Sequence, residues 1–285
     1  MSPARPTGFP RVDVENDFLR MRRRQVLARL THRLLREPDD VNLILPFDEV
    51  VAALGRRGER YLGLKTIRLS TVVGTVDSTR DFDRYFRPTS SRVRERWERL
   101  ALAQARGEPM PPIDVYRVGE LHFVQDGHHR VSIAIAQGQT TIDAYVTEVL
   151  TVVPARGIRR RGDLITKDYE RLFRSRVPLT ADQHSKITVT DPWTFAELGE
   201  AVEAWGFRAM QGERRFLDRE QIAQRWFDEE YLPVVRMLRA AHLIGKRTEA
   251  EAYLAVATER YRIMRTHSWS DEVIDRLRRD RPQPR

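Results

Sequence analysis

The chain has 285 residues, a length that suits one large domain or two ordinary ones, and 41% of them are hydrophobic. It contains no cysteine, which excludes a disulfide scaffold, a cysteine-ligated zinc site and a cysteine nucleophile. The formal net charge is +9, and only four of the fifty basic residues are lysines. Because arginine presents a planar fork of donors to phosphate, an anionic partner is one interpretation. A composition bias of the whole protein is the other.

Residues 14–37 are predicted to form a basic amphipathic helix, because apolar residues recur there about every 3.6 positions among seven arginines. Such a helix could contact DNA or a membrane surface, although a solvated helix face explains the same charges. Residues 1–10 lack the apolar core of a signal peptide, and no apolar run approaches the roughly 20 residues of a membrane span. We therefore expect a cytoplasmic protein with no membrane insertion. A short helix over 47–54 follows and ends at Gly55.

Residues 61–150 are predicted to form an α+β domain, preceded by residues 1–60 as a basic helical extension. Alternating, β-branched segments indicate strands, and apolar residues at helical spacing indicate helices. In chain order the expected elements are a strand from residue 65, a helix over 92–106, a hairpin of strands over 113–117 and 121–125, a helix over 131–137 and a strand over 141–149. This mixture of strands and helices favours an α+β fold with a mixed sheet.

Residues 151–285 are predicted to form an all-α C-terminal domain, because no strong strand signal follows residue 152. Segment 156–176 is interpreted as a basic linker or helix, and the later helices are expected near 192–211, 219–241, 249–266 and 270–279. Their starts are marked by Asp191 before Pro192, by Asp218 with Gln221 and by Thr248 with Glu251. Pro233 predicts a kink. A helix-turn-helix interpretation of 217–239 lacks a small residue at the turn, so one continuous helix is favoured.

The segment Asp126-Gly127-His128-His129-Arg130 is the most informative candidate site in the sequence. It lies between a predicted strand and an apolar helix, where unpaired N–H groups and the helix dipole attract anions. Gly127 permits the turn, and Arg130 can fork onto phosphate oxygens. His128 and His129 can donate to phosphate or move a proton, and Asp126 could hold Mg²⁺ beside a nucleotide. The alternative is a capped strand-to-helix turn with purely structural side chains.

The run from Val124 to Ala134 resembles the "DGxHR" box that follows a β-hairpin in ParB-like domains. With the strands expected over 111–116 and 67–70, it makes residues 67–149 similar to the ParB/sulfiredoxin-like superfamily. That resemblance implies a small mixed-sheet domain whose box binds the phosphates of a nucleoside tri- or diphosphate, with CTP, ATP or ADP as candidates and Mg²⁺ as the metal. Members include CTP-hydrolysing partitioning clamps, free-serine kinases, sulfiredoxins and proteins labelled ParB-like nucleases.

The box departs from several members of this superfamily. Sulfiredoxin needs a cysteine where this chain has histidine, so its chemistry is excluded. Partitioning proteins usually carry two arginines where His129 and Arg130 stand, which argues against clamp activity. The Asp-Gly-His start is more similar to the free-serine kinase branch. By that resemblance Asp126 would lie near the metal, and His128, His129 and Arg130 would lie near the phosphates.

A polar stretch over 74–84 is the second candidate site. ParB-like folds place an arginine facing the nucleotide after the first strand, so the resemblance makes Arg80 and Arg84 phosphate-binding candidates. Asp81 is a candidate for sugar, metal or general-base work, and Asp77 and Asp83 are further carboxylates in the same stretch. Because Asp and Arg alternate here, pairing among surface charges is the competing interpretation.

These patterns predict a nucleotide-binding protein that works as a nucleotide-dependent switch with DNA or a protein partner. DNA would be contacted through the arginine-rich segments, and a homodimer is a further expectation. The first alternative is a small-molecule kinase with Asp81, His128 and His129 as its catalytic groups. The second alternative is an interaction domain without activity. Whether the protein is an enzyme, as an NTPase or a kinase, stays open on the sequence alone.

Overall fold

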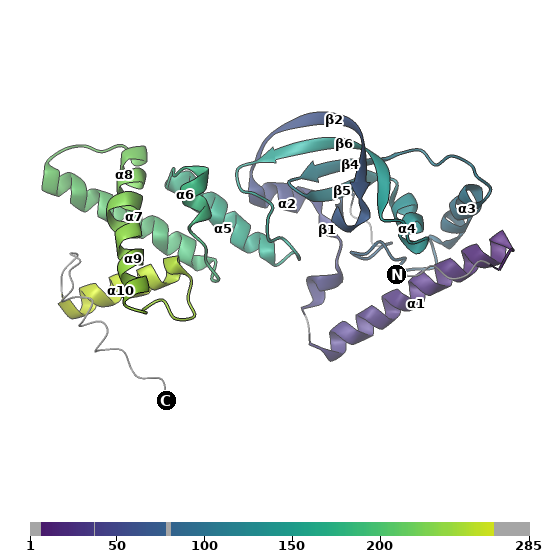
Figure 1. Ribbon diagram of the computed structural model, residues 1–285, viewed down its shortest axis with the longest axis horizontal. Helices are drawn as coiled ribbons and strands as arrows, with labels where there is room; N and C mark the ends of the chain where they lie inside the picture. The colour runs from purple at the N-terminus through teal and green to yellow at the C-terminus, as the bar shows by residue number, and fades with distance from the viewer. Residues whose placement is uncertain (1–6, 37, 78–80, 265–285) are drawn as a thin grey trace. The chain divides into compact units, whose positions relative to one another are not determined.

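The computed structural model describes residues 7–36, 38–77 and 81–264, and its contacts divide the chain into unit 1, up to Lys167, and unit 2, from Asp168 (Figure 1). The mixed α/β character predicted for the first of these regions is confirmed. The expected divisions were at 60/61 and 150/151, whereas the contacts give one division, at 167/168. The reason is burial: Val153, Ile158 and Leu164 pack into the core of the sheet unit.

A six-stranded mixed sheet forms the centre of unit 1. The strands are β1 (Leu45–Pro46), β2 (Arg56–Arg68), β3 (Val72–Thr75), β4 (Ile113–Val118), β5 (Leu121–Asp126) and β6 (Thr141–Thr151), in the order β1-β3-β5-β4-β6-β2. β3 runs parallel to both β1 and β5, β4 runs parallel to β6, and the β4–β5 and β6–β2 pairs are antiparallel. The parallel β3–β5 pair is important for the site, because the carboxyl ends of both strands meet at one edge.

The predicted hairpin and final strand are confirmed as β4, β5 and β6, but β2 is longer than expected. It begins at Arg56, well before the predicted start at residue 65. Residues 56–64 are rich in arginine and glycine and carry no alternating pattern. Their strand conformation comes from pairing with β6, which extends from Arg56 opposite Thr151 to Arg68 opposite Thr141.

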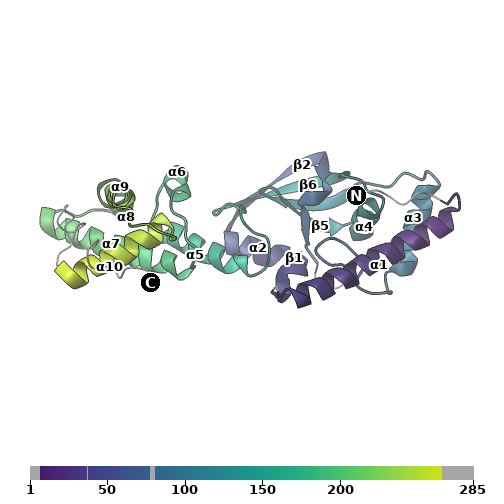
Figure 2. The ribbon, with the colours of Figure 1, turned by 60° about the horizontal axis from the view of Figure 1, so that its bottom comes forward.

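Four α-helices accompany the sheet among the described residues of unit 1. They are α1 (Pro10–Leu34), α2 (Phe47–Leu54), α3 (Arg94–Ala105) and α4 (His128–Ala136), with short 3₁₀ turns at Asp39–Asn42 and Leu69–Thr71. α1 packs against α3 and α4 (Figure 2). Its Phe18 meets Trp97 of α3 edge-on, with ring centroids 5.5 Å apart. Trp97 Nε1 donates to Ser132 Oγ of α4 over 3.0 Å, inside the core. The N-terminal helix is therefore part of unit 1 rather than a separate extension.

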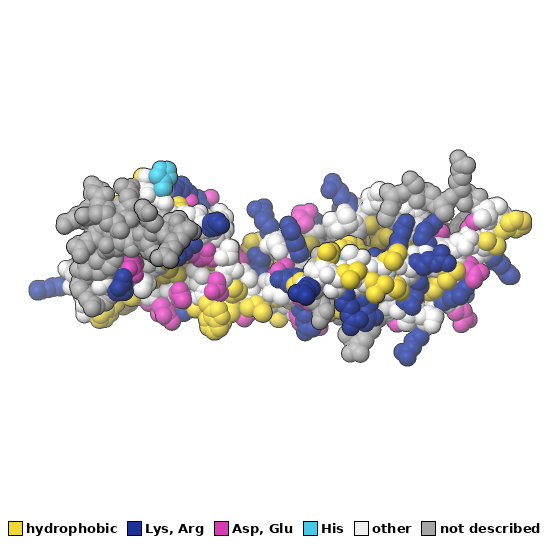
Figure 3. All heavy atoms as spheres, turned by 90° about the horizontal axis from the view of Figure 1, so that it is seen from below, with side chains coloured by type: hydrophobic (Ala, Val, Ile, Leu, Met, Phe, Trp, Pro, Cys, Tyr) yellow, Lys and Arg dark blue, Asp and Glu magenta, His cyan; other side chains and the backbone are white. Residues whose placement is uncertain are grey.

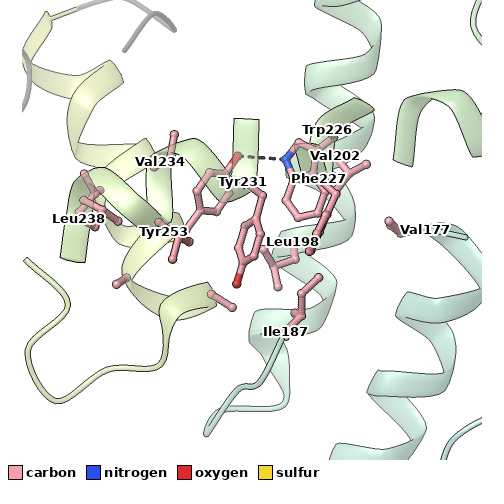
Figure 4. Packing of buried hydrophobic residues seen from close by; sticks show 14 of the residues in the cluster. Val177, Ile187, Leu198, Val202, Trp226, Phe227, Tyr231, Val234, Leu238 and Tyr253 are labelled. Carbon is pink, nitrogen blue, oxygen red and sulfur yellow. Dashed lines mark hydrogen bonds between the residues drawn. The ribbon is translucent and has the colours of Figure 1, made fainter. Parts of the chain in front are cut away.

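Unit 2 is helical, as predicted, over its described residues. Its helices are α5 (Asp163–Arg176, which begins in unit 1), α6 (Ala181–Ser185), α7 (Trp193–Glu213), α8 (Arg219–Arg225), α9 (Leu232–Ala240) and α10 (Glu249–Met264). Aromatic side chains form much of its core, and Trp226 Nε1 donates to Tyr253 Oη over 3.2 Å (Figure 4). The helix expected over 270–279 lies outside the described residues.

The long helix expected over 219–241 is continuous, which confirms the preference against a helix-turn-helix there. Its irregularity is a π-helical turn over Trp226–Tyr231 that joins α8 to α9. Pro233 stands in the first turn of α9. Because proline has no N–H and its ring clashes with the preceding turn, a widened turn just before it accommodates the residue. The capping box of Asp218 with Gln221 is also confirmed.

Candidate anion site at the start of α4

The turn from β5 into α4 depends on Gly127. β5 ends at Asp126, and Gly127 has φ 105° and ψ 19°, a left-handed conformation that favours glycine. A Cβ atom here would lie 2.4 Å from Cγ2 of the buried Ile113 on β4. Glycine is therefore needed twice, for the backbone conformation and for the close approach to β4. The turn leaves His128 and His129 in the first turn of α4.

Parallel pairing of β3 with β5 brings Thr75, the last residue of β3, to His128. Thr75 Oγ1 lies 2.6 Å from His128 Nε2 and donates its own proton to the Val124 carbonyl over 3.3 Å. With its proton on that carbonyl, the hydroxyl can accept from Nε2–H, and this tautomer has the lone pair of the imidazole on Nδ1. Burial lowers the pKa of His128, while the charges of Asp77, Asp126 and Asp81 oppose that change. The neutral ring is the form that this environment favours.

His129 has an unpartnered nitrogen. Its Nε2 is buried and forms no hydrogen bond within the described part of the chain. Burial, with a smaller contribution from the positive charge of Arg96, lowers the pKa of His129 to about 4. Phe82 meets the ring edge-on, with centroids 5.3 Å apart. Because a buried polar atom without a partner is uncommon in a folded protein, this nitrogen marks a place where a bound group could supply the acceptor.

Three carboxylates lie near the two histidines: Asp77 and Asp126 are exposed, and Asp81 is half-buried. Across residues 7–36, 38–77 and 81–264, no group of three or more His, Asp or Glu side chains has the geometry to hold a metal ion. Mg²⁺ in nucleotide sites commonly uses one or two carboxylates and completes its shell with water and phosphate oxygens. The exposed carboxylate of Asp126 fits that kind of site, and a metal cage made by the protein alone is not formed by the residues described.

Arg130 is engaged within the chain. Its Nη1 donates to the carbonyl oxygens of Pro111 (2.7 Å) and Pro112 (2.5 Å), and its Nη2 pairs with Asp126. The side chain is only 13% exposed. It also lines a hollow of about 250 Å³ with Thr66, a hollow that neither His128 nor His129 lines. In this conformation Arg130 ties α4 to the segment before β4, and a contact with phosphate would compete with those bonds.

The described residues of the second candidate stretch, 74–84, lie in two different environments: Asp81 is near the histidines, and Arg84 is not. Asp81 lies near both histidines, since its charge acts on each. Arg84 does not act on either one. It is half-buried, its pKa is lowered by burial, and the charges that oppose this change come from Tyr85 and Asp163. Arg80, the third residue predicted in this stretch, lies outside the described residues.

Asp83 has a structural role in the same loop. It is buried, accepts from the backbone N–H of Tyr85 (2.9 Å) and Arg87 (3.0 Å), and pairs with the Arg87 guanidinium over 2.7 Å. These bonds hold Phe86 at φ 52°, with its ring fully buried in the core. The loop therefore holds a buried ion pair between Asp83 and Arg87, a residue just beyond the candidate stretch, and this pair is not the surface pairing that the competing interpretation expected.

Sequence reasoning missed Thr75, Phe82 and Arg96 as parts of the site. Thr75 and Phe82 lie about 50 residues before the histidines in the chain, and Arg96 belongs to α3. The resemblance had pointed to the stretch after the first strand, but it identified charged side chains only. Nothing in the local pattern marks a threonine at a strand end or a phenylalanine in a loop as a neighbour of an imidazole.

Comparison of the chain with protein-family models, with curated proteins and with solved structures gives no match. Among the described residues, every helix is too short or too polar to cross a membrane. The geometry at the start of α4 is therefore what bears on function. It combines a left-handed glycine, two neutral histidines, one of them with an unpartnered nitrogen, and three nearby carboxylates.

Proposed function

We propose that unit 1 is a ParB-like nucleotide-binding module that holds the phosphates of a nucleoside tri- or diphosphate, such as CTP, ATP or ADP, at the start of α4. The observation that carries this proposal is the buried, unpartnered Nε2 of His129 in the first turn of the helix. A neutral imidazole can donate one hydrogen bond to a phosphate oxygen. The free N–H groups of the first turn and the positive end of the helix dipole attract the same anion.

The carboxylates decide how the phosphates would be bound. Asp77, Asp81 and Asp126 place negative charge around His128, and that charge repels a bare polyphosphate. Mg²⁺, when bound, would neutralise both the carboxylates and the phosphates. Asp126 is the residue proposed to hold it, because its carboxylate is 64% exposed. Nucleotide binding is therefore expected to require Mg²⁺.

We favour a nucleotide-dependent switch that acts with DNA or a protein partner. A switch needs two conformations for which the nucleotide has different affinities. The hydrogen bonds of Arg130 suggest how two such conformations could differ. If phosphate draws the guanidinium away from the Pro111 and Pro112 carbonyls, the segment before β4 is released. A small-molecule kinase is the second candidate. It is supported by the lone pair on His128 Nδ1 and the nearby Asp81, either of which could accept a proton from a hydroxyl substrate.

A thermal-shift panel tests the proposal. The full chain is heated with CTP, ATP, ADP or GTP, each with and without Mg²⁺. A ligand at a hundred times its dissociation constant stabilises the folded state by about 2.7 kcal/mol, so binding should be plain. We expect one nucleotide to raise the melting temperature, and only with Mg²⁺. If none of the four does so under either condition, the proposed function is wrong.

Matched variants locate the site. His129→Gln should weaken the shift, and Asp126→Asn should weaken its dependence on Mg²⁺. Asp48→Asn, an exposed carboxylate on α2 in the same unit, is the control and should leave both unchanged. Arg130→Ala is a less specific probe, because it also removes the bonds to Pro111 and Pro112. Release of ADP or AMP only when free serine is present would select the kinase over the switch.

A further inference from the structure

Helix α1 has two apolar faces, and the described residues cover only one of them. Val14, Phe18 and Met21 are buried against α3 and α4. A second set of apolar residues, 36% to 83% exposed, lies along the same helix: Val12, Leu19, Val26, Leu27, Leu30 and Leu34. At 3.6 residues per turn these six side chains occupy about a third of the helix circumference, on the side opposite the buried face. We call this set the α1 stripe.

The surroundings of the α1 stripe are positively charged. The exposed Arg23 lies within it, the exposed Arg33 lies along its edge, and the exposed Arg29 lies further round the helix. Residues 18–36 contain no Asp or Glu. The acidic residues of α1 all precede this segment, and each already has a partner. Asp13 accepts from Thr7 (2.8 Å), Glu15 pairs with Arg94 (2.5 Å), and Asp17 pairs with Arg20. The leucines and arginines therefore share one surface, as the yellow and blue side chains of Figure 3 show.

The combination of charge and apolar area indicates the kind of partner. A nucleic acid backbone would satisfy the arginines but would leave the leucines in water. A second copy of α1 would cover the leucines but would bring arginine-rich segments together, and two of the three acids that could compensate, Glu15 and Asp17, are already in ion pairs. An anionic lipid surface satisfies both, since its headgroups attract the arginines and its acyl boundary takes up the leucines.

We propose that α1 binds peripherally to membranes that contain anionic lipids, with the α1 stripe buried at the headgroup–acyl boundary. Val12 to Leu34 spans about 33 Å along the helix axis, at 1.5 Å per residue, so the helix would lie in the plane of the membrane. This mode of binding needs no membrane-spanning helix. It also does not depend on the nucleotide proposal, because the α1 stripe contains none of the residues at the start of α4.

Vesicle co-sedimentation of the full chain tests this inference. The two probes are vesicles of phosphatidylcholine alone and vesicles of equal parts phosphatidylcholine and phosphatidylglycerol. We expect at least roughly tenfold tighter binding to the anionic vesicles, because each arginine near such a surface contributes about a fivefold gain in affinity. The affinity should fall as salt rises. Equal affinity for both kinds of vesicle, or no binding to either, would overturn the proposal.

Paired variants separate the two contributions. Leu27→Gln with Leu34→Gln should weaken binding to the anionic vesicles roughly tenfold, because two leucines no longer enter the acyl boundary. Glutamine keeps the helix propensity, and circular dichroism verifies the fold. The matched control is Ile165→Gln with Leu172→Gln, two exposed aliphatic residues of α5, and it should bind like the parent. If both double variants weaken binding equally, the α1 stripe is not the contact.

Two further outcomes would replace the proposal. The first is a dimer in sedimentation velocity that is lost in the Leu27→Gln and Leu34→Gln variant, with no vesicle binding by the parent protein. That result would make the α1 stripe a self-association surface. The second is binding of duplex DNA, again with no vesicle binding, that is lost with Arg29→Gln and Arg33→Gln but kept with Leu27→Gln and Leu34→Gln. That result would make the same helix a nucleic-acid-binding surface. Vesicle binding that needs both the leucines and the arginines would support the membrane assignment.

Discussion

Replacement of Gly127 by alanine tests the turn that positions the candidate site. The residue has φ 105°, and its added Cβ would lie 2.4 Å from Cγ2 and 2.9 Å from Cβ of the buried Ile113. The left-handed conformation costs alanine about 1–2 kcal/mol, and forcing a methyl group into a packed core costs about 1–3 kcal/mol. Gly127→Ala should therefore lower the free energy of unfolding of unit 1 by about 2–5 kcal/mol.

Gly107→Ala is the matched control. Gly107 also has a positive φ, 82°, but nothing lies within 4 Å of the place that an alanine methyl group would occupy. Its replacement should cost only the conformational part, about 1–2 kcal/mol. Urea unfolding followed by hydrogen exchange of the amides in β4 and β5 reports on unit 1 separately from unit 2. The difference between the two variants measures the clash with Ile113.

A second substitution isolates the contact itself. In an Ile113→Ala background the Cγ2 at 2.4 Å is gone but the Cβ at 2.9 Å remains, so the cost of Gly127→Ala should fall part of the way toward that of Gly107→Ala. The expected coupling energy is about 0.5–3 kcal/mol in this double-mutant cycle. If Gly127→Ala costs no more than Gly107→Ala, or if its cost is the same with alanine at 113, the close approach of the turn to β4 is refuted.

Three other predictions concern buried polar groups of unit 1. Ser132→Ala removes the acceptor for Trp97 Nε1 and should lower the free energy of unfolding in urea by about 1–3 kcal/mol; a variant as stable as the parent would contradict that bond. Asp83→Asn leaves the Arg87 guanidinium, 14% exposed, without its charge partner. It should lower the free energy of unfolding by about 3 kcal/mol in the same assay. A change near zero would argue against a buried pair. Burial holds the pKa of His122 at about 4, below the usual 6.5. The folded protein then binds fewer protons than the unfolded chain between these pH values, so stability should fall as pH drops from 6.5 to 4. His122→Gln should make that fall less steep, and an unchanged slope in urea titrations at several pH values would refute the assignment.

The part of the candidate site that lies in the turn from β5 into α4 was predictable from residues adjacent in the sequence. A glycine between an alternating segment and an apolar helical segment indicates a tight strand-to-helix turn, and the structure has Gly127 in that role. The helix was expected over 131–137, whereas the structure begins it at His128, which puts both histidines in its first turn. Their partners did not follow from the local pattern, because Thr75 reaches His128 only through the parallel pairing of β3 with β5.

The partner of each arginine was not predictable either. Arg130 was expected to meet phosphate, and it bonds to the carbonyls of Pro111 and Pro112. Arg84 was a phosphate-binding candidate in the second stretch, and the charges that act on it are those of Tyr85 and Asp163. A guanidinium on a long side chain can reach several acceptors, and the sequence does not state which of them folding brings within reach. That selection depends on contacts between residues far apart in the chain.

The sequence by itself determined the β4–β5 hairpin and the strand β6, the helical character of the second half and the helix start at Asp218. These features depend on apolar periodicity and on capping groups within a few residues of one another. Only the tertiary structure decided that the boundary falls at 167/168, that β2 extends back to Arg56, and which face of α1 is buried. The physical reason is that burial and strand pairing are made between distant segments. An apolar side chain such as Leu30 has the same local pattern whether folding covers it or leaves it in water.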